Sequence, residues 1–223
     1  LIKFIEVDAF LVCGFRSVIA GIFLLPFLRP KKLNFGPWMI IYLLSYCGLC
    51  VGIVLALRQT SAAIAVGMQY ASVIWLFIVS VIMTKKVEKS RVLPVVLITL
   101  GVVLFMLTGL EGSSMTGNLI AFTESICFAF MTVGVKKCAG DNVLGLTALA
   151  NLFTGFFVFA FLPPQFTDVL AFNGQEWLIM IILGTVQVGL GYAFYNMGVA
   201  RTTPQKASII ALWEMILGPT WVA

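Results

Sequence analysis

Residues 60–83 read TSAAIAVGMQYASVIWLFIVSVIM, a run of 24 residues that contains no charged side chain. About 20 consecutive apolar residues are enough for an α-helix to cross the hydrocarbon core of a bilayer. Backbone polar groups cannot stay unpaired in hydrocarbon, so a spanning segment is either a helix or a strand of a closed barrel. Barrel strands alternate strictly between polar and apolar residues, and this run does not. It therefore predicts a transmembrane helix in an all-α membrane protein.

The composition of the whole chain indicates the same class. Apolar residues make up 61% of the 223 residues and charged residues only 10%, whereas soluble domains carry about 25% charged residues. This small number of charged side chains cannot cover a water-facing surface. We therefore expect the lipid bilayer to surround the chain. The absence of histidine from the sequence excludes histidine metal ligands and histidine general bases.

The five cysteines predict neither a disulfide framework nor a metal site. Four of them fall inside apolar segments, and Cys47 and Cys50 form a CxxC pair with no second pair to complete a zinc site. We interpret them as small apolar packing residues. The sequence also lacks a phosphate-binding loop and a nucleotide-binding motif. We therefore expect no metal, no cofactor and no enzymatic activity.

Eight runs are long enough to span the membrane, and short polar stretches separate them. They cover residues 10–28, 37–57, 60–83, 92–110, 117–135, 144–162, 177–199 and 204–223. This division leaves no room for a soluble domain or a long linker.

Basic residues concentrate in alternate loops. The loops after Leu28, Met83, Val135 and Val199 hold 11 of the 14 Lys and Arg residues, if Lys206 just beyond the last loop is included. Cytoplasmic loops are enriched in Lys and Arg, so we expect these four loops in the cytoplasm and Leu1 outside. The net charge of +5 then reflects membrane topology, and we expect no nucleic-acid partner. The pattern predicts a multi-pass protein of the bacterial inner membrane.

Two parts of the chain resemble each other at an offset of 143 residues. The offset pairs Gly48 with Gly191, and Arg58 and Thr60 with Arg201 and Thr203. The matching segments lie five helices apart, so they cross the membrane in opposite directions, as in the inverted repeats of secondary transporters. We expect ten helices from two five-helix repeats. Residues 1–110 would hold helices 2–5 and residues 117–223 helices 6–9, with one helix before and one after the eight counted above.

Four short motifs stand in order along the chain: Phe15-Arg16-Ser17-x-x-Ala20, Ala56-Leu57-Arg58-x-Thr60-Ser61-Ala62, Gly191-Tyr192-x-x-Tyr195-Asn196 and Gly198-Val199-Ala200-Arg201-Thr202-Thr203-Pro204, followed by Trp213-Glu214. In these motifs the chain resembles the EamA-type permeases of the drug/metabolite transporter superfamily. This resemblance implies transport of small metabolites, usually export, through a central cavity between two halves.

Three charged residues lie inside predicted spans. A charge at mid-helix costs about 2.5–3.5 kcal/mol on insertion scales, so Arg16, Glu124 and Glu214 should point into the bundle or into a wet cavity. Glu214 lies near mid-membrane and is a candidate proton carrier. Glu124 is expected near the outer side, at the cavity mouth or paired with Arg16. Arg16 either attracts an anionic or zwitterionic substrate, or it snorkels to the membrane surface or pairs with a carboxylate.

Polar and aromatic residues predict the lining of a substrate cavity. These are Gln69, Tyr70, Gln187, Tyr192, Tyr195, Asn196 and Trp213. Gln187, Gly191 and Tyr195 are four residues apart and share one helical face. Glycines predict close helix packing at Gly48 and Gly52, and along a stripe of Gly184, Gly191 and Gly198.

These features predict a secondary transporter that exports amino acids, related metabolites or amphipathic drugs, driven by a proton or solute gradient. One alternative is an exchanger of nucleotide sugars or phosphates, which would need several cations in the cavity. A membrane-embedded enzyme and a receptor or structural membrane protein are further alternatives. The sequence contains no catalytic cluster at an interface, and the inverted repeat favours transport.

Overall fold

The computed structural model describes residues 8–87, 89–108, 114–162 and 173–211, and every regular element in these ranges is a helix. The helices are α1 (Ala9–Leu24), η2 (Leu25–Phe27), η3 (Pro30–Lys32), α2 (Pro37–Gln59), α3 (Ala62–Gln69), α4 (Ser72–Thr84), α5 (Lys89–Thr108), α6 (Met115–Cys138), α7 (Val143–Phe161), α8 (Gly174–Ile182), η5 (Leu183–Leu190), α9 (Gly191–Arg201) and α10 (Pro204–Ala211). The prediction of an all-α chain is confirmed.

Six helical stretches in the described ranges are long and apolar enough to cross a membrane. They are Ala9–Phe27, Pro37–Gln59, Ala62–Thr84, Met115–Cys138, Val143–Phe161 and Gly174–Arg201. The fourth predicted span corresponds to α5, which contains the shorter apolar stretch Val92–Leu104. The eighth begins with α10, and its remainder lies outside the described residues. The chain is thus a multi-pass membrane protein.

Side chains at the polar boundaries fix where the helices begin. Asp8 accepts hydrogen bonds from the amides of Phe10 and Leu11, at 2.7 and 3.1 Å, and so caps α1. Asn173 and Glu176 form a reciprocal capping box at the start of α8. Such caps satisfy amide groups that have no partner within the helix.

Two of the spanning helices are irregular near their middle. The run 60–83 is divided at Tyr70–Ala71, where the amides of these two residues bond to the carbonyls three residues earlier. The stretch Gly174–Arg201 contains the π-helical segment η5 between α8 and α9. Discontinuous spanning helices often form substrate sites near the membrane midplane, and π-helical turns often mark functional sites.

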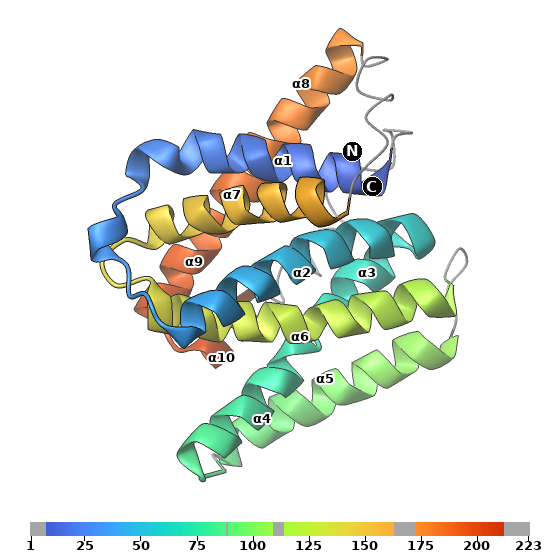
Figure 1. Ribbon diagram of the computed structural model, residues 1–223. Coiled ribbons are helices and arrows are strands. Elements are labelled where there is room, and N and C mark those ends of the chain that lie inside the picture. The colour runs from blue at the N-terminus through green and yellow to red at the C-terminus, as the bar shows by residue number, and fades with distance from the viewer. Residues whose placement is uncertain (1–7, 88, 109–113, 163–172, 212–223) are drawn as a thin grey trace.

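The packing of the helices has the directions that an inverted repeat requires. Helices α1 and α7, each of which precedes one of the two matching segments, are antiparallel: Gly14 lies against Phe159 and Gly21 against Leu152. Helix α1 also packs beside η5, and α7 packs beside α2, which are equivalent pairs under the repeat. Figure 1 shows α1, α7, α2 and α6 as neighbouring rods, with α8, η5 and α9 crossing them.

Two glycines bring α2 close to α6, as the sequence predicted. A Cβ atom at Gly48 would lie 2.8 Å from Sγ of Cys127, and one at Gly52 would lie 2.9 Å from Cγ of Glu124. The predicted glycine stripe on the stretch Gly174–Arg201 does not pack as one surface. Gly184 packs tightly against α1, whereas a Cβ at Gly198 would meet no atom of the described residues within 4 Å. The stripe is therefore not a single packing surface, and that part of the prediction is wrong.

The four loops rich in Lys and Arg gather at one end of the bundle, which we call the basic end (residues 29–36, 84–87, 89–91, 136–143 and 200–203). The amide of Asn34 donates to the carbonyl of Cys138 at 3.0 Å. Nζ of Lys136 donates to the carbonyl of Ala200 at 2.7 Å. Helix α4, which leads into the remaining loop, contacts α10.

Candidate functional site

A pocket of about 210 Å³ lies between helices of the two matching parts of the chain, and we call it the central pocket. It is lined by Arg16, Ile53, Leu57, Val66, Gln69, Phe128, Gln187, Val188, Gly191, Tyr192 and Tyr195. These residues come from α1, α2, α3, α6, η5 and α9. A pocket built from both parts can change shape when the parts move relative to each other.

Arg16 is the one cation among the described residues of this lining. Its side chain is 3% exposed and its Nη2 donates to the carbonyl oxygen of Cys50 at 2.9 Å. Nε has no hydrogen-bond partner among the described residues. A guanidinium has five N–H donors in a fixed fork, so Arg16 retains donors for a ligand in the pocket.

The π-helical segment and α9 supply much of the polar wall. Gln187 lies within η5, and Gly191 and Tyr195 follow at intervals of four residues along the same helix. All three line the pocket.

Aromatic and hydroxyl contacts hold the two tyrosines of the wall in place. The hydroxyl of Tyr195 is hydrogen-bonded to Oγ1 of Thr132 at 2.9 Å, and its ring lies 5.1 Å from that of Phe128. The ring of Tyr192 lies 5.2 Å from that of Tyr46, edge to face. The pocket thus has a rigid aromatic side.

Gln69 reaches the pocket from the last turn of α3, directly before the helix break. Its neighbour Tyr70 is 2% exposed and is not part of the lining. The two adjacent residues therefore point to different surroundings.

A model of the EamA-like transporter family matches residues 1–107 and, a second time, residues 115–221. The chain belongs to this family. The resemblance noted from the sequence motifs is confirmed, and the double match agrees with a fold made of two repeats. No protein with a curated description matches the chain.

In this EamA-like transporter, Asn196 lies in a buried network between helices. Its Nδ2 donates to Oγ1 of Thr147 at 2.9 Å and lies 3.5 Å from the hydroxyl of Tyr42. Asn151 adds a second link, because its Nδ2 donates to the hydroxyl of Tyr46 at 2.8 Å. The network joins α2, α7 and α9. Asn196 is fully buried and does not line the central pocket.

Glu124 occupies a buried position on α6. It is 2% exposed, and neither carboxylate oxygen has a hydrogen-bond partner among the described residues. Its side chain packs on Gly52, and Arg16 is the cation with which it interacts electrostatically. Glu124 is not in the pocket lining.

The remaining predicted site residues, Trp213 and Glu214, lie outside the described residues. The pocket also contains residues that polarity could not identify, since Ile53, Leu57 and Phe128 are apolar. Ile53 and Leu57 are four residues apart on α2, a spacing that an apolar helix offers at many positions. Only the partner helices determine which of these faces borders a cavity.

Proposed function

We propose that this chain is a secondary transporter that exports small metabolites or drugs across the bacterial inner membrane by alternating access. The observation that carries the proposal is the central pocket, which both matching parts of the chain line. Residues 1–110 and 117–223 would act as the two halves that move around it. Substrate sites of inverted-repeat transporters lie at such repeat interfaces.

The chemistry of the lining favours a small solute with an anionic or zwitterionic group. Arg16 would bind a carboxylate through its remaining donors, while Gln69 and Gln187 would supply adaptable hydrogen bonds. Tyr192 and Tyr195 would pack against an apolar part of the substrate. The volume of about 210 Å³ is below the roughly 300–1,000 Å³ of pockets for drug-sized ligands. Amino acids and related metabolites therefore fit better than large drugs.

A nucleotide-sugar or phosphate exchanger fits the pocket less well. Several phosphate charges need several cations, and the lining that the structure describes contains one, Arg16.

Proton coupling would use Glu124. A carboxylate that binds a proton in a dry site, and ionises when water or Arg16 comes closer, would link proton movement to substrate binding. The two residues lie on α6 and α1, so a change in the packing of these helices would alter their interaction. Glu214 stays a second candidate for the same role.

The basic end would face the cytoplasm, because cytoplasmic loops are enriched in Lys and Arg. Export would then start from this end.

The proposal is tested in proteoliposomes that contain the intact protein and a trapped pH dye. Amino acids, purines, sugars, sugar nucleotides and cationic drugs are added one at a time, with and without a proton gradient. We expect anionic or zwitterionic solutes to move and the dye to respond. Solute movement without a dye response would remove proton coupling. Movement of sugar nucleotides alone would favour the exchanger.

A further inference from the structure

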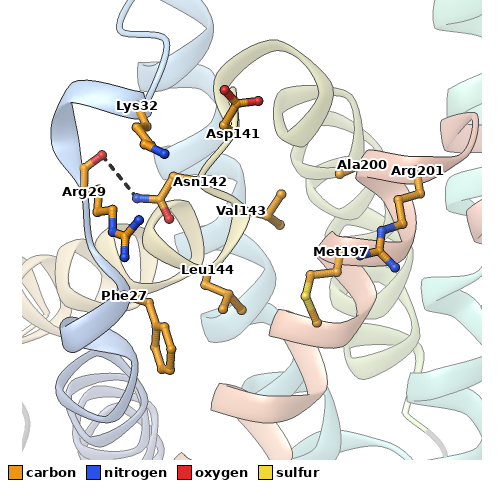
Figure 2. A pocket seen from close by; sticks show the side chains of 10 residues that line it. All are labelled: Phe27, Arg29, Lys32, Asp141, Asn142, Val143, Leu144, Met197, Ala200 and Arg201. Carbon is orange, nitrogen blue, oxygen red and sulfur yellow. Dashed lines mark hydrogen bonds between the residues drawn. The ribbon is translucent and has the colours of Figure 1, made fainter.

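A second pocket, of about 350 Å³, lies at the basic end, and we call it the basic-end pocket. Arg29 and Lys32 reach it from the loop after α1, and Arg201 reaches it from the end of α9. Figure 2 shows the two guanidinium groups on opposite sides of the pocket, with Lys32 and Asp141 towards its rim. Nothing in the proposed transport cycle uses these residues.

The charge in this pocket is predominantly positive. Three cationic side chains face one carboxylate, that of Asp141. None of the three cations forms an ion pair within the part of the chain that the structure describes. An anion that entered the pocket could therefore bind the guanidinium groups without displacing an existing partner.

Apart from Asn142, the rest of the lining is apolar. The apolar side of the pocket is formed by Phe27, Leu144 and Met197. Phe27 is 49% exposed, and the exposed Phe23 lies one turn further along α1. The positive rim is thus continuous with the apolar surface that faces lipid, which is the arrangement that an amphipathic ligand needs.

Hydrogen bonds between loops hold the rim in place. Asn142 is 7% exposed and donates from Nδ2 to the carbonyl of Arg29 at 3.1 Å, while its Oδ1 accepts from the amide of Gly145. Gly140, at φ +49°, brings its backbone against the carbonyl of Lys32. The loop that carries two of the cations is therefore fixed to the start of α7.

The basic-end pocket is separate from the central pocket. Met197 lies on nearly the opposite side of α9 from Tyr195, because two residues turn an α-helix by about 200°. Among the described residues, the linings of the two pockets have none in common. The buried bond between Asn196 and Thr147 lies between α9 and α7. A ligand at the basic end would therefore not occupy the substrate site.

We propose that the basic-end pocket binds the phosphate of an anionic phospholipid, with the acyl chains along Phe27 and the apolar surface of α1. Arg and Lys side chains would bind a phosphate group in the same way whether it belongs to a lipid or to a soluble phosphate. The apolar floor and its continuity with the lipid-facing surface favour the lipid. Basic pockets between transmembrane helices are typical sites for such headgroups. This inference does not depend on the identity of the transported solute or on its direction of transport.

The test is native mass spectrometry of the intact, detergent-purified protein titrated with phosphatidylglycerol or with phosphatidylcholine of the same chain length. The pocket variant is Arg29→Gln with Arg201→Gln. The matched control is Lys85→Gln with Lys86→Gln, which removes two charges from another loop of the basic end. Size-exclusion chromatography checks folding, and Arg201→Lys tests a milder change.

We expect the intact protein to retain phosphatidylglycerol in preference to phosphatidylcholine. The affinity of the pocket variant for phosphatidylglycerol should fall on the order of tenfold, because two cations that would contact the headgroup are removed. The affinity of the control variant should stay unchanged. Arg201→Lys should keep part of the affinity. Equal loss in both variants, or no preference for the anionic lipid, would overturn the proposal. Displacement of the lipid by millimolar inorganic phosphate or glycerol 3-phosphate would also overturn it, in favour of a soluble ligand.

Discussion

The guanidinium of Arg16 donates from Nη2 to the main-chain carbonyl of Cys50 over 2.9 Å, which ties α1 to α2 at the wall of the central pocket. A main-chain acceptor holds the side chain in place without neutralising its charge. The positive charge stays available to the pocket, and its loss should affect substrate binding more than folding.

Replacing Arg16 by Gln should weaken the binding of anionic or zwitterionic solutes. A hydrogen bond to a charged group contributes about 1.5–3 kcal/mol, so KM should rise about ten- to one-hundred-fold. The KM of Arg16→Lys should lie between that of the unsubstituted protein and that of Arg16→Gln, since lysine keeps the charge and loses the planar fork of donors. Initial rates of solute uptake into proteoliposomes measure this effect. An unchanged KM in Arg16→Gln would remove Arg16 from the substrate site.

Replacing Glu124 by Gln should separate solute movement from proton movement. The amide keeps the size of the side chain and cannot ionise, so exchange of solute between the two sides should continue while proton flux falls to the level of empty liposomes. Glu176→Gln is the matched control, because Glu176 is a partly exposed carboxylate in the capping box of α8. Full substrate-driven proton flux in Glu124→Gln would leave Glu214→Gln as the variant to examine.

Replacing Asn196 by Ala should destabilise the protein and leave KM unchanged. Its Nδ2 bonds to Thr147, and interhelical hydrogen bonds in membrane proteins contribute about 0.6 kcal/mol on average and up to about 1.7. We expect the free energy of unfolding in detergent to fall by about 1 kcal/mol. Gln187→Ala is the control and should show the reverse, a raised KM with little loss of stability. A raised KM in Asn196→Ala would return this residue to the pocket.

Two glycines on the same long helix should respond differently to a methyl group. A Cβ at Gly184 would lie 2.7 Å from Cβ of Ile19 and 2.9 Å from the carbonyl of Arg16. Gly184→Ala should therefore lower the free energy of unfolding by about 1–3 kcal/mol through overpacking. Gly198→Ala should change it little, since no atom of the part of the chain that the structure describes lies within 4 Å of the added Cβ. Equal effects of the two substitutions on thermal unfolding would contradict this packing.

Hydropathy predicted the spanning helices because the bilayer sets their length. The span expected at 10–28 is observed at Ala9–Phe27, and the span expected at 144–162 is observed at Val143–Phe161. The break at Tyr70 was not predicted. Residues 60–83 contain no proline, and one glycine, Gly67, two residues before the end of α3 is not a sufficient signal.

The sequence was less informative about which polar residues face the cavity. Tyr195 lines the central pocket, while its neighbour Asn196 is buried among helices. Adjacent residues on a helix point about 100° apart, and polarity alone does not distinguish a side chain that faces a cavity from one that bonds to another helix. The seven-residue spacing of the glycines did not predict a single packing surface for a related reason. The π-helical segment η5 changes the helical period between Gly184 and Gly191.

Thiol modification of Gln187→Cys tests the central claim, alternating access of the central pocket, most directly. A membrane-impermeant thiol reagent is added from either side of oriented proteoliposomes, and solute transport is measured afterwards. Phe194→Cys is the control, because Phe194 is 64% exposed on the same helix and is not in the pocket. We predict inhibition of Gln187→Cys from both sides, protection by substrate, and no inhibition of the control or of the protein without the substitution. Reaction of Gln187→Cys from one side alone, or labelling without loss of transport, would contradict the account.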